Sequence, residues 1–443
     1  INAGIWGNHL AITTGVNRIN ADNSQATAGT STGATPTVAI DTSALGGMYA
    51  GKITLVGTEN GVGVNNAGQI AASAGNVSID INGMLSNSGT INANLDASGA
   101  AKTQIKSTNL KNTGTISSQG DTDIQTASLS NSATIAAGRE AKLNATDLNN
   151  STGTINGQRI DITTNSLNNT QGKIQQTGAQ ALALEAGSIN NANKGLIGYE
   201  PLDAGTGSGT GGTGTGTGTT PPPSTATGGG SSTVVQPAPV ALADGQIKVN
   251  SSINNDAGQI TANGGIDLTA KNGLENHATL NLNKLKVTGD SLDNSSGSIT
   301  TVQTEVATRS VNNVAGKIQT YGNSSISAHQ IDNATGLIRS DLANTLTASS
   351  INNSNTQGTE QGIEGGTVAI QSNTLNNTKG AIRSKVDLTA EGMGLVNGSI
   401  DNTQGLMSSN GTLNLKDNNS NTLAITNTAG QIISDGNNTV QAK

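Results

Sequence analysis

Aromatic residues are almost absent from this chain of 443 residues. It contains no Phe, one Trp (Trp6) and three Tyr (Tyr49, Tyr199 and Tyr321), whereas Gly alone numbers 59. A globular core of this length normally draws much of its buried area from aromatic side chains. The deficit argues against the two or three globular domains that length alone suggests. It favours a thin structure whose interior has room mainly for Ile, Leu, Val and Ala.

Charged residues are scarce too, at 12% of the chain, and the net charge is −7. Both signs are scattered singly, so there is no Lys/Arg cluster for a phosphate backbone and no aromatic platform for stacking bases. No apolar run approaches the roughly 18 residues that a membrane-spanning helix requires. We therefore expect no nucleic acid, no membrane span and no small-molecule substrate.

Cysteine is missing altogether. A cytosolic protein needs no disulfides, and a chain that crosses a periplasm unfolded avoids oxidation into loops, so this absence is compatible with either compartment. The opening stretch, INAGIWGNHL, does not resemble a signal peptide.

What the chain does contain is a repeat, seen clearly in SLNNTQGKI at residues 166–174. An aliphatic residue with an Asn two positions later opens each unit, and most steps between units are 18 to 25 residues. These leading aliphatic residues are Leu110, Leu129, Leu148, Leu167, Ile189, Ile253, Leu274, Leu292, Val311, Ile331, Ile351, Leu375, Ile400 and Ile425.

Each unit holds two more aliphatic positions. A second aliphatic residue follows six to eight positions on, usually just after a Gly, at Ile116, Ile135, Ile155, Ile174, Ile260, Ile299, Ile318, Ile338, Ile382 and Ile432. A third run alternates aliphatic and polar residues, as at Ile160–Ile162, Leu182–Leu184, Ile266–Leu268 and Val386–Leu388. Each unit therefore predicts three short strands.

A period near 20 residues predicts a solenoid whose units bury their apolar faces only by stacking. Alternation favours strands, and Asn-Asn, Asn-Gly and Thr-Gly pairs mark the corners. We expect an all-β parallel β-helix with coils of about 20 residues and aliphatic ladders. The Asn two places after each leading aliphatic residue should stack on the Asn of the next coil. A leucine-rich-repeat fold would need a helical segment per unit, which the pattern lacks.

Residues 38–72, VAIDTSALGGMYAGKITLVGTENGVGVNNAGQIAA, carry a more specific resemblance. They resemble the C-terminal edge of the two-partner secretion domain in filamentous-haemagglutinin-type exoproteins, including contact-dependent growth inhibition exoproteins. The preceding INAGIWGNHLAITTGVNRI is similar to the same family. The repeats resemble the haemagglutinin repeat, so the resemblance covers nearly the whole chain.

The resemblance implies a long right-handed β-helix that is secreted, displayed on the bacterial cell surface and associated with the outer membrane. Its implied role is adhesion or toxin delivery. The implied partners are an outer-membrane β-barrel transporter of the two-partner secretion type, for the full-length protein, and a receptor on target cells. The family's N-terminal Asn-Pro-Asn-Gly-type motifs are missing, and repeats run nearly to Lys443. We therefore expect an internal piece of a larger protein, without the secretion signal and without any C-terminal toxin.

Composition and resemblance divide the chain into four parts. Residues 1–66 form the C-terminal edge of the two-partner secretion domain, and residues 67–203 and 240–443 form β-helix repeats. Residues 204–239 are a Gly/Thr/Pro-rich loop or linker, since six of the seven prolines lie at positions 201–239. We favour one β-helix carrying a loop over two separate domains.

No residue qualifies as catalytic, cofactor-binding or metal-binding, and no cofactor is expected. His9, His277 and His329 lie in separate units without metal-like spacing, so isolated solvated histidines are the expectation. Asp residues in the alternating runs should point outward but lie coils apart, whereas a polysaccharide-cleaving site needs carboxylates gathered on adjacent coils. They are Asp80, Asp161, Asp267 and Asp387. We expect no enzyme.

Two other motifs have structural interpretations. GTENGVGV at residues 57–64 lacks the helix and Lys of a phosphate-binding loop, so it predicts a β-helix corner. The calcium-binding nonapeptide GGxGxDxUx does not occur.

Two functions remain. The first is a structural stalk that projects an adhesin or toxin-delivery activity carried elsewhere. The second is an adhesive module whose lateral face binds receptors or carbohydrate. A carbohydrate site would gather exposed aromatic residues in one groove, and the four aromatic residues are widely scattered along the chain. The sequence therefore favours the stalk.

Overall fold

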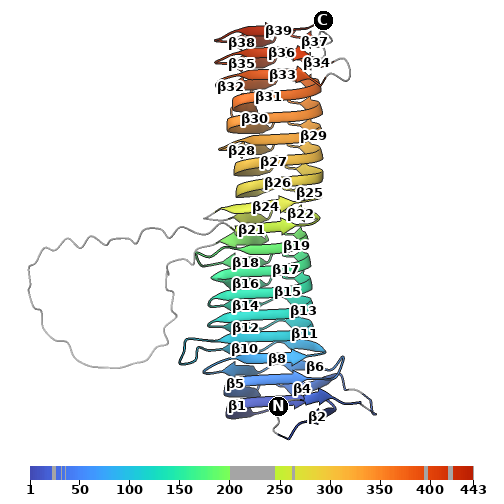
Figure 1. Ribbon diagram of the computed structural model, residues 1–443, viewed down its shortest axis with the longest axis vertical. Helices are drawn as coiled ribbons and strands as arrows, with labels where there is room; N and C mark the ends of the chain where they lie inside the picture. The colour runs from blue at the N-terminus through green and yellow to red at the C-terminus, as the bar shows by residue number, and fades with distance from the viewer. Residues whose placement is uncertain are drawn as a thin grey trace, which may run out of the picture.

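Nearly every strand pairs in parallel with a strand one coil further along the chain, so the backbone winds around one axis from β1 to β39 (Figure 1). The computed structural model describes residues 1–21, 26–30, 32–34, 36–199, 245–261, 265–393, 398–417 and 423–442. Within these residues every regular element is a β-strand, and no helix is available to cross a membrane. The predicted all-β parallel β-helix is confirmed.

Long strands bend around corners of the coil and merge two or three of the short runs predicted from the sequence. They are β1 (Gly4–Thr14), β5 (Gly47–Gly57), β11 (Lys102–Asn112), β13 (Asp121–Asn131), β15 (Glu140–Asn149), β17 (Arg159–Asn168), β19 (Ala183–Asn190), β26 (Thr279–Asp293), β27 (Ser298–Asn312), β29 (Ser324–Asp332), β30 (Leu337–Asn352) and β31 (Gly362–Asn376).

Short strands carrying the second aliphatic position form one side of the column. They are β7 (Gln69–Ala72), β10 (Thr90–Ala93), β12 (Thr115–Ser118), β14 (Thr134–Ala137), β16 (Thr154–Gly157), β18 (Lys173–Gln176), β20 (Leu196–Tyr199), β23 (Gln259–Thr261), β28 (Lys317–Thr320), β32 (Ala381–Ser384), β35 (Leu406–Ser409) and β38 (Gln431–Ser434).

The remaining short strands complete the other two sides. They are β4 (Val38–Thr42), β6 (Gly63–Asn66), β8 (Val77–Ile81), β9 (Met84–Asn87), β21 (Gly245–Val249), β22 (Ser252–Asn254), β24 (Ile266–Ala270), β25 (Gly273–Glu275), β33 (Leu388–Gly392), β34 (Ser399–Asp401), β36 (Leu413–Asp417), β37 (Ala424–Thr426) and β39 (Asn438–Val440). An antiparallel pair, β2 (Asn17–Ile19) and β3 (Ala26–Ala28), stands outside the stack.

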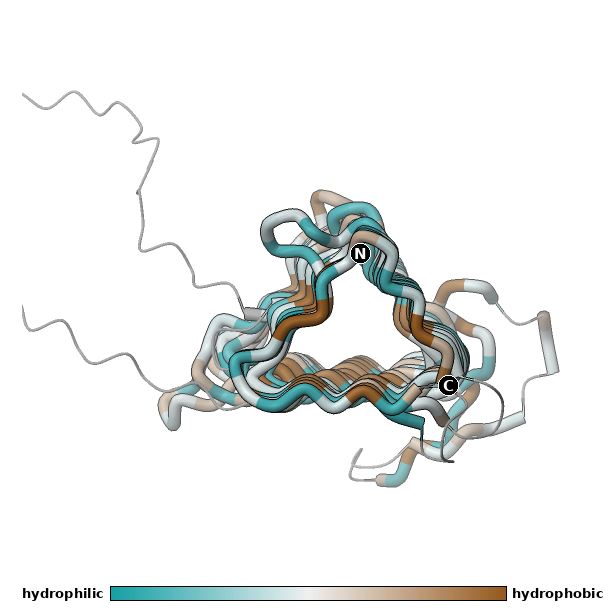
Figure 2. The backbone as a smooth tube through the Cα atoms, turned by 90° about the horizontal axis from the view of Figure 1, so that it is seen from above, coloured by the Kyte–Doolittle hydropathy of each residue, from teal (hydrophilic) through white to brown (hydrophobic). Residues whose placement is uncertain are grey.

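The column is roughly triangular when seen along its axis, with three flat sides (Figure 2). Leu110, Leu129, Leu148, Leu167 and Ile189 pair in succession, each buried, as the leading aliphatic ladder predicts. The second aliphatic ladder is fully buried over its whole central length. So thin a core is filled by single aliphatic side chains from each side, which explains the shortage of aromatic residues.

A ladder of Asn side chains, buried except at its last member Asn427, runs along one inner corner. In each coil the Asn Nδ2 donates to the Asn Oδ1 of the next coil at 2.7–3.0 Å. The predicted stacking of these Asn residues is confirmed. The ladder comprises Asn66, Asn87, Asn112, Asn131, Asn150, Asn169, Asn191, Asn255, Asn276, Asn294, Asn313, Asn333, Asn353, Asn377, Asn402 and Asn427.

The Asn-Asn pairs in the sequence have two separate tasks. The second Asn points inward and joins the ladder, while the preceding Asn or Asp faces outward and accepts from the N–H two residues later. Asn168, for example, accepts from Thr170 N at 3.1 Å, and the next residue, Asn169, is fully buried. Such Asx-type bonds satisfy backbone donors at the corner.

The stack is continuous from β19 and β20 to the strands that follow residue 244. β19 pairs with β21 and β22, β20 pairs with β23, and Asn191 Nδ2 donates to Asn255 Oδ1 at 2.8 Å across 64 residues of sequence. The predicted loop at residues 204–239 lies outside the described residues.

Two local predictions can be compared with the structure. GTENGVGV forms the corner between β5 and β6, where Gly61 has a left-handed φ of 80°. The alternating run at residues 386–388 was expected to direct both aliphatic residues inward, which is wrong for Val386. Val386 is 51% exposed, because the strand that buries its side chains begins at Leu388.

Candidate functional site

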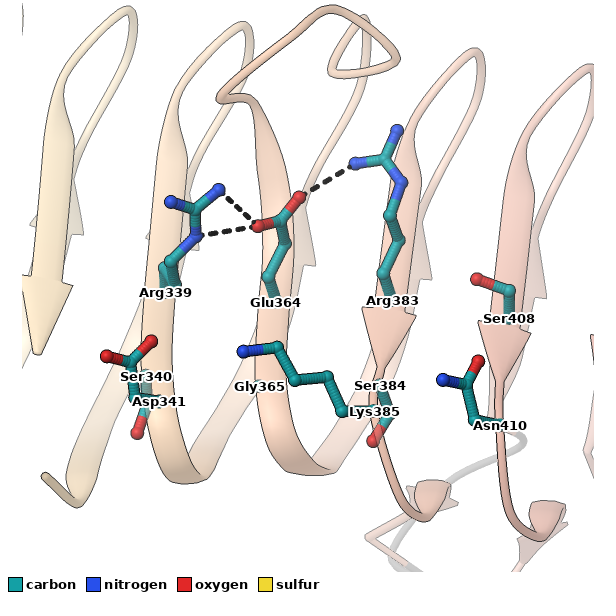
Figure 3. Close-up of a pocket in the computed structure, with 10 residues that line it drawn as sticks. All are labelled: Arg339, Ser340, Asp341, Glu364, Gly365, Arg383, Ser384, Lys385, Ser408 and Asn410. Atoms are coloured by element: carbon teal, nitrogen blue, oxygen red, sulfur yellow. Dashed lines mark hydrogen bonds and ion pairs between the residues drawn. The ribbon is translucent and has the colours of Figure 1, made fainter. Parts of the chain in front are cut away.

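A groove crosses the outer surface of β30, β31, β32 and β35. Arg339, Glu364 and Arg383 stand in register on successive coils, and Ser408 follows on the next (Figure 3). All four come directly after a buried residue of the second aliphatic ladder, so strand alternation turns their side chains outward. The groove has a volume of about 490 Å³.

Glu364 holds the two guanidinium groups in place. Arg339 Nε and Nη2 lie 2.7 and 2.6 Å from Glu364 Oε2, and Arg383 Nη1 lies 3.0 Å from Glu364 Oε1. Arg383 Nη1 also donates to the Gln361 carbonyl at 3.1 Å. The Glu364 side chain is only 18% exposed, and charge-assisted bonds of this kind are stronger than neutral ones. The arginine pair is therefore pre-organised.

A short loop beside the groove replaces the usual corner turn. Thr356 takes the place of the expected Gly, and its buried hydroxyl donates to the Asn353 carbonyl and accepts from Ala381 N. The loop then projects as residues 357–361 before the coil resumes at Gly362, whose φ is 115°. Its Glu360 pairs with Lys317 at 2.6 Å, which ties the loop to an earlier coil.

The loop also borders a second hollow. Gln357 Nε2 donates to the Gln404 carbonyl at 2.5 Å, and Arg383 lines this hollow as well as the groove. The hollow has a volume of about 390 Å³. Arg383 therefore stands between two recesses on the same face.

Four large apolar side chains lie exposed near the groove, and we call them the apolar corner. Val302, Tyr321, Leu342 and Val386 are 51%, 54%, 57% and 51% exposed. Leu342 and Val386 directly follow the groove residues Asp341 and Lys385, and Tyr321 follows Thr320, which pairs with Ser340 of the groove. Exposed apolar groups gathered on one edge mark interaction surfaces more often than scattered ones do.

His277 is not the isolated histidine that the sequence suggests. Its Nδ1 lies 3.5 Å from Asp256 Oδ1 and 3.8 Å from Glu275 Oε1, and its Nε2 lies 3.6 Å from Asp293 Oδ1. The carboxylates approach opposite nitrogens of the ring. No group of His, Cys, Asp or Glu side chains among the described residues is arranged to hold a metal ion.

The other residues weighed in the sequence lie where alternation predicts. Asp80, Asp161, Asp267 and Asp387 face outward, half-buried or exposed, on separate coils. The aromatic residues are not all scattered, however. Trp6 and Tyr49 pair in register and their rings stack at 4.3 Å, which corrects the expectation for these two.

The groove was missed in the sequence, although a signal for it exists. The residue after the second aliphatic position is polar and uncharged in most units, but is Arg339, Glu364 and Arg383 in three successive coils. The loop at 357–361 lengthens one coil, so Ile363 does not follow Ile351 at the usual six to eight positions. Aligning the units with that loop removed would have brought the three charges together.

Comparisons with known proteins agree with the resemblance seen in the sequence. Residues 1–91 match the TPS secretion domain, where TPS stands for two-partner secretion. Toxin CdiA of Yersinia pestis is 53% identical over 94 residues, and tRNA nuclease CdiA-2 of Burkholderia pseudomallei is 47% identical over 93 residues. Each match covers 21% of this chain and 3% of the relative.

The tRNA nuclease CdiA of Escherichia coli strain NC101 is 45% identical over 100 residues, which is 23% of this chain and 3% of the relative. No solved structure matches. The chain therefore spans a small part of these long relatives. The match to the TPS secretion domain and the similarity to CdiA proteins confirm the resemblance to two-partner secretion exoproteins of the contact-dependent inhibition type.

Proposed function

We propose that this chain is a structural stalk segment of a large secreted two-partner exoprotein, which projects an adhesin or toxin-delivery activity away from the cell. The observation that carries the proposal is the Asn ladder, unbroken from Asn66 to Asn427. From Asn66 onward it joins each coil to the next in a fixed register. Such a stack supplies length and stiffness, and we assign it no catalytic role.

The relatives' names indicate what the whole protein would deliver. They are called toxins or tRNA nucleases. We propose that the parent of this chain also carries a toxin or an adhesin, that a two-partner outer-membrane transporter exports it, and that the stalk stands at the cell surface and presents it to a receptor on target cells. The match at residues 1–91 supports the transporter.

Deleting two whole coils tests the stalk. Removing residues 129–166 joins Ser128 to Leu167, and because Ser128, Asp147 and Ser166 share one register position, Asn112 would then meet Asn169. The parent exoprotein should remain displayed and active, with a stalk about 10 Å shorter. Display is measured by antibody access on intact cells, and activity by target-cell killing or adhesion. Loss of activity with normal display would refute a purely structural role.

Removing residues 129–139 is the matched control, because it takes out about half a coil. Inward aliphatic residues would then face outward polar positions of the next coil. We expect local unfolding at that junction.

The second candidate function is adhesion through the lateral face itself. The groove at Arg339, Glu364 and Arg383 with its neighbouring apolar corner favours it, since this is a recess rather than a flat polar sheet.

A further inference from the structure

The groove has unused hydrogen-bonding groups on two adjacent coils. Arg383 and Lys385 extend from one coil, and Ser408 and Asn410 extend from the next, with Arg383 and Ser408 in direct register. Among the described residues, the side chains of Lys385, Ser408 and Asn410 have no hydrogen-bonding or ionic partner of their own. Glu364 and the Gln361 carbonyl engage only one terminal nitrogen of Arg383, Nη1. These four side chains therefore offer unused donors on two adjacent coils, with Arg383 and Lys385 extending to opposite sides of the groove (Figure 3).

Charge narrows the class of ligand. The groove is lined by three cations, Arg339, Arg383 and Lys385, and by two carboxylates, Asp341 and Glu364, so its formal charge is +1. One carboxylate on a ligand would balance it. A polyanion would meet the Asp341 carboxylate at the other end of the groove and gain less, because like charges repel.

The size of the groove and its surroundings narrow the class of ligand further. A groove of about 490 Å³ is within the usual range of small-ligand pockets. Ser408 and Asn410 can bond hydroxyl groups as donors or acceptors. Val386 of the apolar corner directly follows Lys385 and provides an exposed apolar surface for the C–H face of a ring.

We propose that this groove binds a saccharide unit bearing a single carboxylate, as in a uronic acid. The carboxylate lies against Arg383, the unpaired Lys385 side chain turns toward it on binding, and the hydroxyls lie against Ser408 and Asn410 on the adjacent coil. This inference rests on the second proposed function, adhesion through the lateral face, and names its ligand class.

Binding of methyl β-glucuronide to the whole 443-residue chain, followed by calorimetry or ligand-observed NMR, tests the proposal. Methyl β-glucoside should bind at least tenfold more weakly, because a charge-assisted hydrogen bond contributes roughly that factor. Lys385→Gln should weaken glucuronide binding by a similar factor. Lys385 makes no side-chain contact that the fold needs, so this variant should fold normally.

Two further variants sharpen the result. Lys173→Gln is the control, since Lys173 is an exposed lysine on the same side of the column in β18, far from the groove. It should leave binding unchanged. Asp341→Asn raises the formal charge of the groove to +2 and should improve binding of glucose 6-phosphate, a dianion.

Three outcomes overturn the inference. They are equal binding of glucoside and glucuronide, equal weakening by Lys173→Gln and Lys385→Gln, and tighter binding of a sulfated polysaccharide that Lys385→Gln does not reduce. The stalk proposal is tested at residues 129–166, outside the groove. Failure of one experiment is therefore distinguishable from failure of the other.

Discussion

At the scale of single residues, the Asn ladder explains why a chain with so few large side chains can specify its register. A neutral amide both donates and accepts, so identical side chains can bond to one another along the axis. Asn150 Nδ2 reaches Asn169 Oδ1 at 2.8 Å, the Gly153 carbonyl at 3.2 Å and the Lys173 carbonyl at 3.2 Å. A one-residue slip would leave these buried groups unpaired.

Asn150→Ala should therefore be costly. It leaves Asn169 Oδ1 without its donor and removes the acceptor of Asn131 Nδ2, and unsatisfied buried polar groups cost about 1 to 3 kcal/mol each. We expect a local loss of about 2 to 4 kcal/mol, measured by amide hydrogen exchange in β14 to β18. Asn144→Ala is the control, since Asn144 is exposed in the strand just before Asn150 and should change little. Equal effects of the two substitutions would contradict the ladder's role.

The Gly three residues after a ladder Asn is needed because the turn has no room for a Cβ atom, not because its φ is positive. In the turn after Asn313, the left-handed residue is Ala315, with φ of 55°, and Gly316 follows it. A Cβ on Gly316 would overlap the carbonyl oxygen of Asn294 in the preceding coil and lie 2.6 Å from Asn313 Oδ1.

Single substitutions at these two positions should differ in their effect on stability. Gly316→Ala should destabilise its coil by about 3 kcal/mol, at the upper end of overpacking costs. Ala315→Gly should be neutral or slightly stabilising, because relief of about 1 to 2 kcal/mol of left-handed strain offsets the added freedom of the unfolded chain. Thermal unfolding of both variants measures this. A larger loss for Ala315→Gly than for Gly316→Ala would refute the packing explanation.

The ladder Asn could be predicted because the same residue recurs at the same offset in each unit. The surroundings of His277 could not. Its three carboxylates come from neighbouring positions on three coils, and the turn Asn276-His277-Ala278 is one residue shorter than most. Position along the sequence therefore does not show which outward side chains meet, although it shows which inward ones do.

At the scale of elements, the corner that follows β26 carries a pH-sensitive contact. Burial acts to raise the pKa of Asp293, but hydrogen bonds from Ser295 N at 3.0 Å and Ser295 Oγ at 2.8 Å, with the charge of His277 and the Asn312 amide, lower the pKa by more. A lowered pKa means that the ionised form is stabilised by folding.

Because folding lowers the pKa of Asp293, its carboxylate should stabilise the fold at neutral pH and lose that effect in acid. The contribution of Asp293 should be present above its ordinary pKa of 3.8 and should be lost as pH falls through the lowered value. Asp293→Asn should therefore speed hydrogen exchange at Ser295 near neutral pH, and the difference should shrink as pH falls through the lowered pKa of Asp293. Asp290→Asn, in the same strand but well exposed, is the control. A difference between Asp293→Asn and the native chain that persists at low pH would contradict this assignment.

The groove shows how one altered element creates a site on a regular scaffold. The stack keeps Arg339, Glu364 and Arg383 in register, while the loop at 357–361 and the apolar corner break the flat surface beside them. The fold class, the ladders and the corners could be predicted from the repeat. The groove could not, because it depends on the departure of one coil from the common length.

At the scale of the whole molecule, contacts join each coil mainly to its two neighbours. Leu167, for example, pairs only with Leu148 and Ile189 along its ladder, and no strand of the described residues bridges distant coils. The free energy of unfolding of such a stack is close to the sum of contributions from single coils and from the interfaces between neighbouring coils. Damage should therefore remain near its origin instead of unfolding the column.

Leu167→Asp tests this locality. The substitution places a charge at a position that is 2% exposed and removes an aliphatic contact on both sides, at a cost of at least about 3 to 5 kcal/mol. Hydrogen exchange measured by mass spectrometry should show lost protection in β15, β17 and β19, with native protection retained in β30 to β32. The exposed Asn165→Asp, two residues away, should leave both regions protected. Uniform loss of protection along the column would show instead that the coils unfold as one cooperative unit, and a stalk built of replaceable coils would then be untenable.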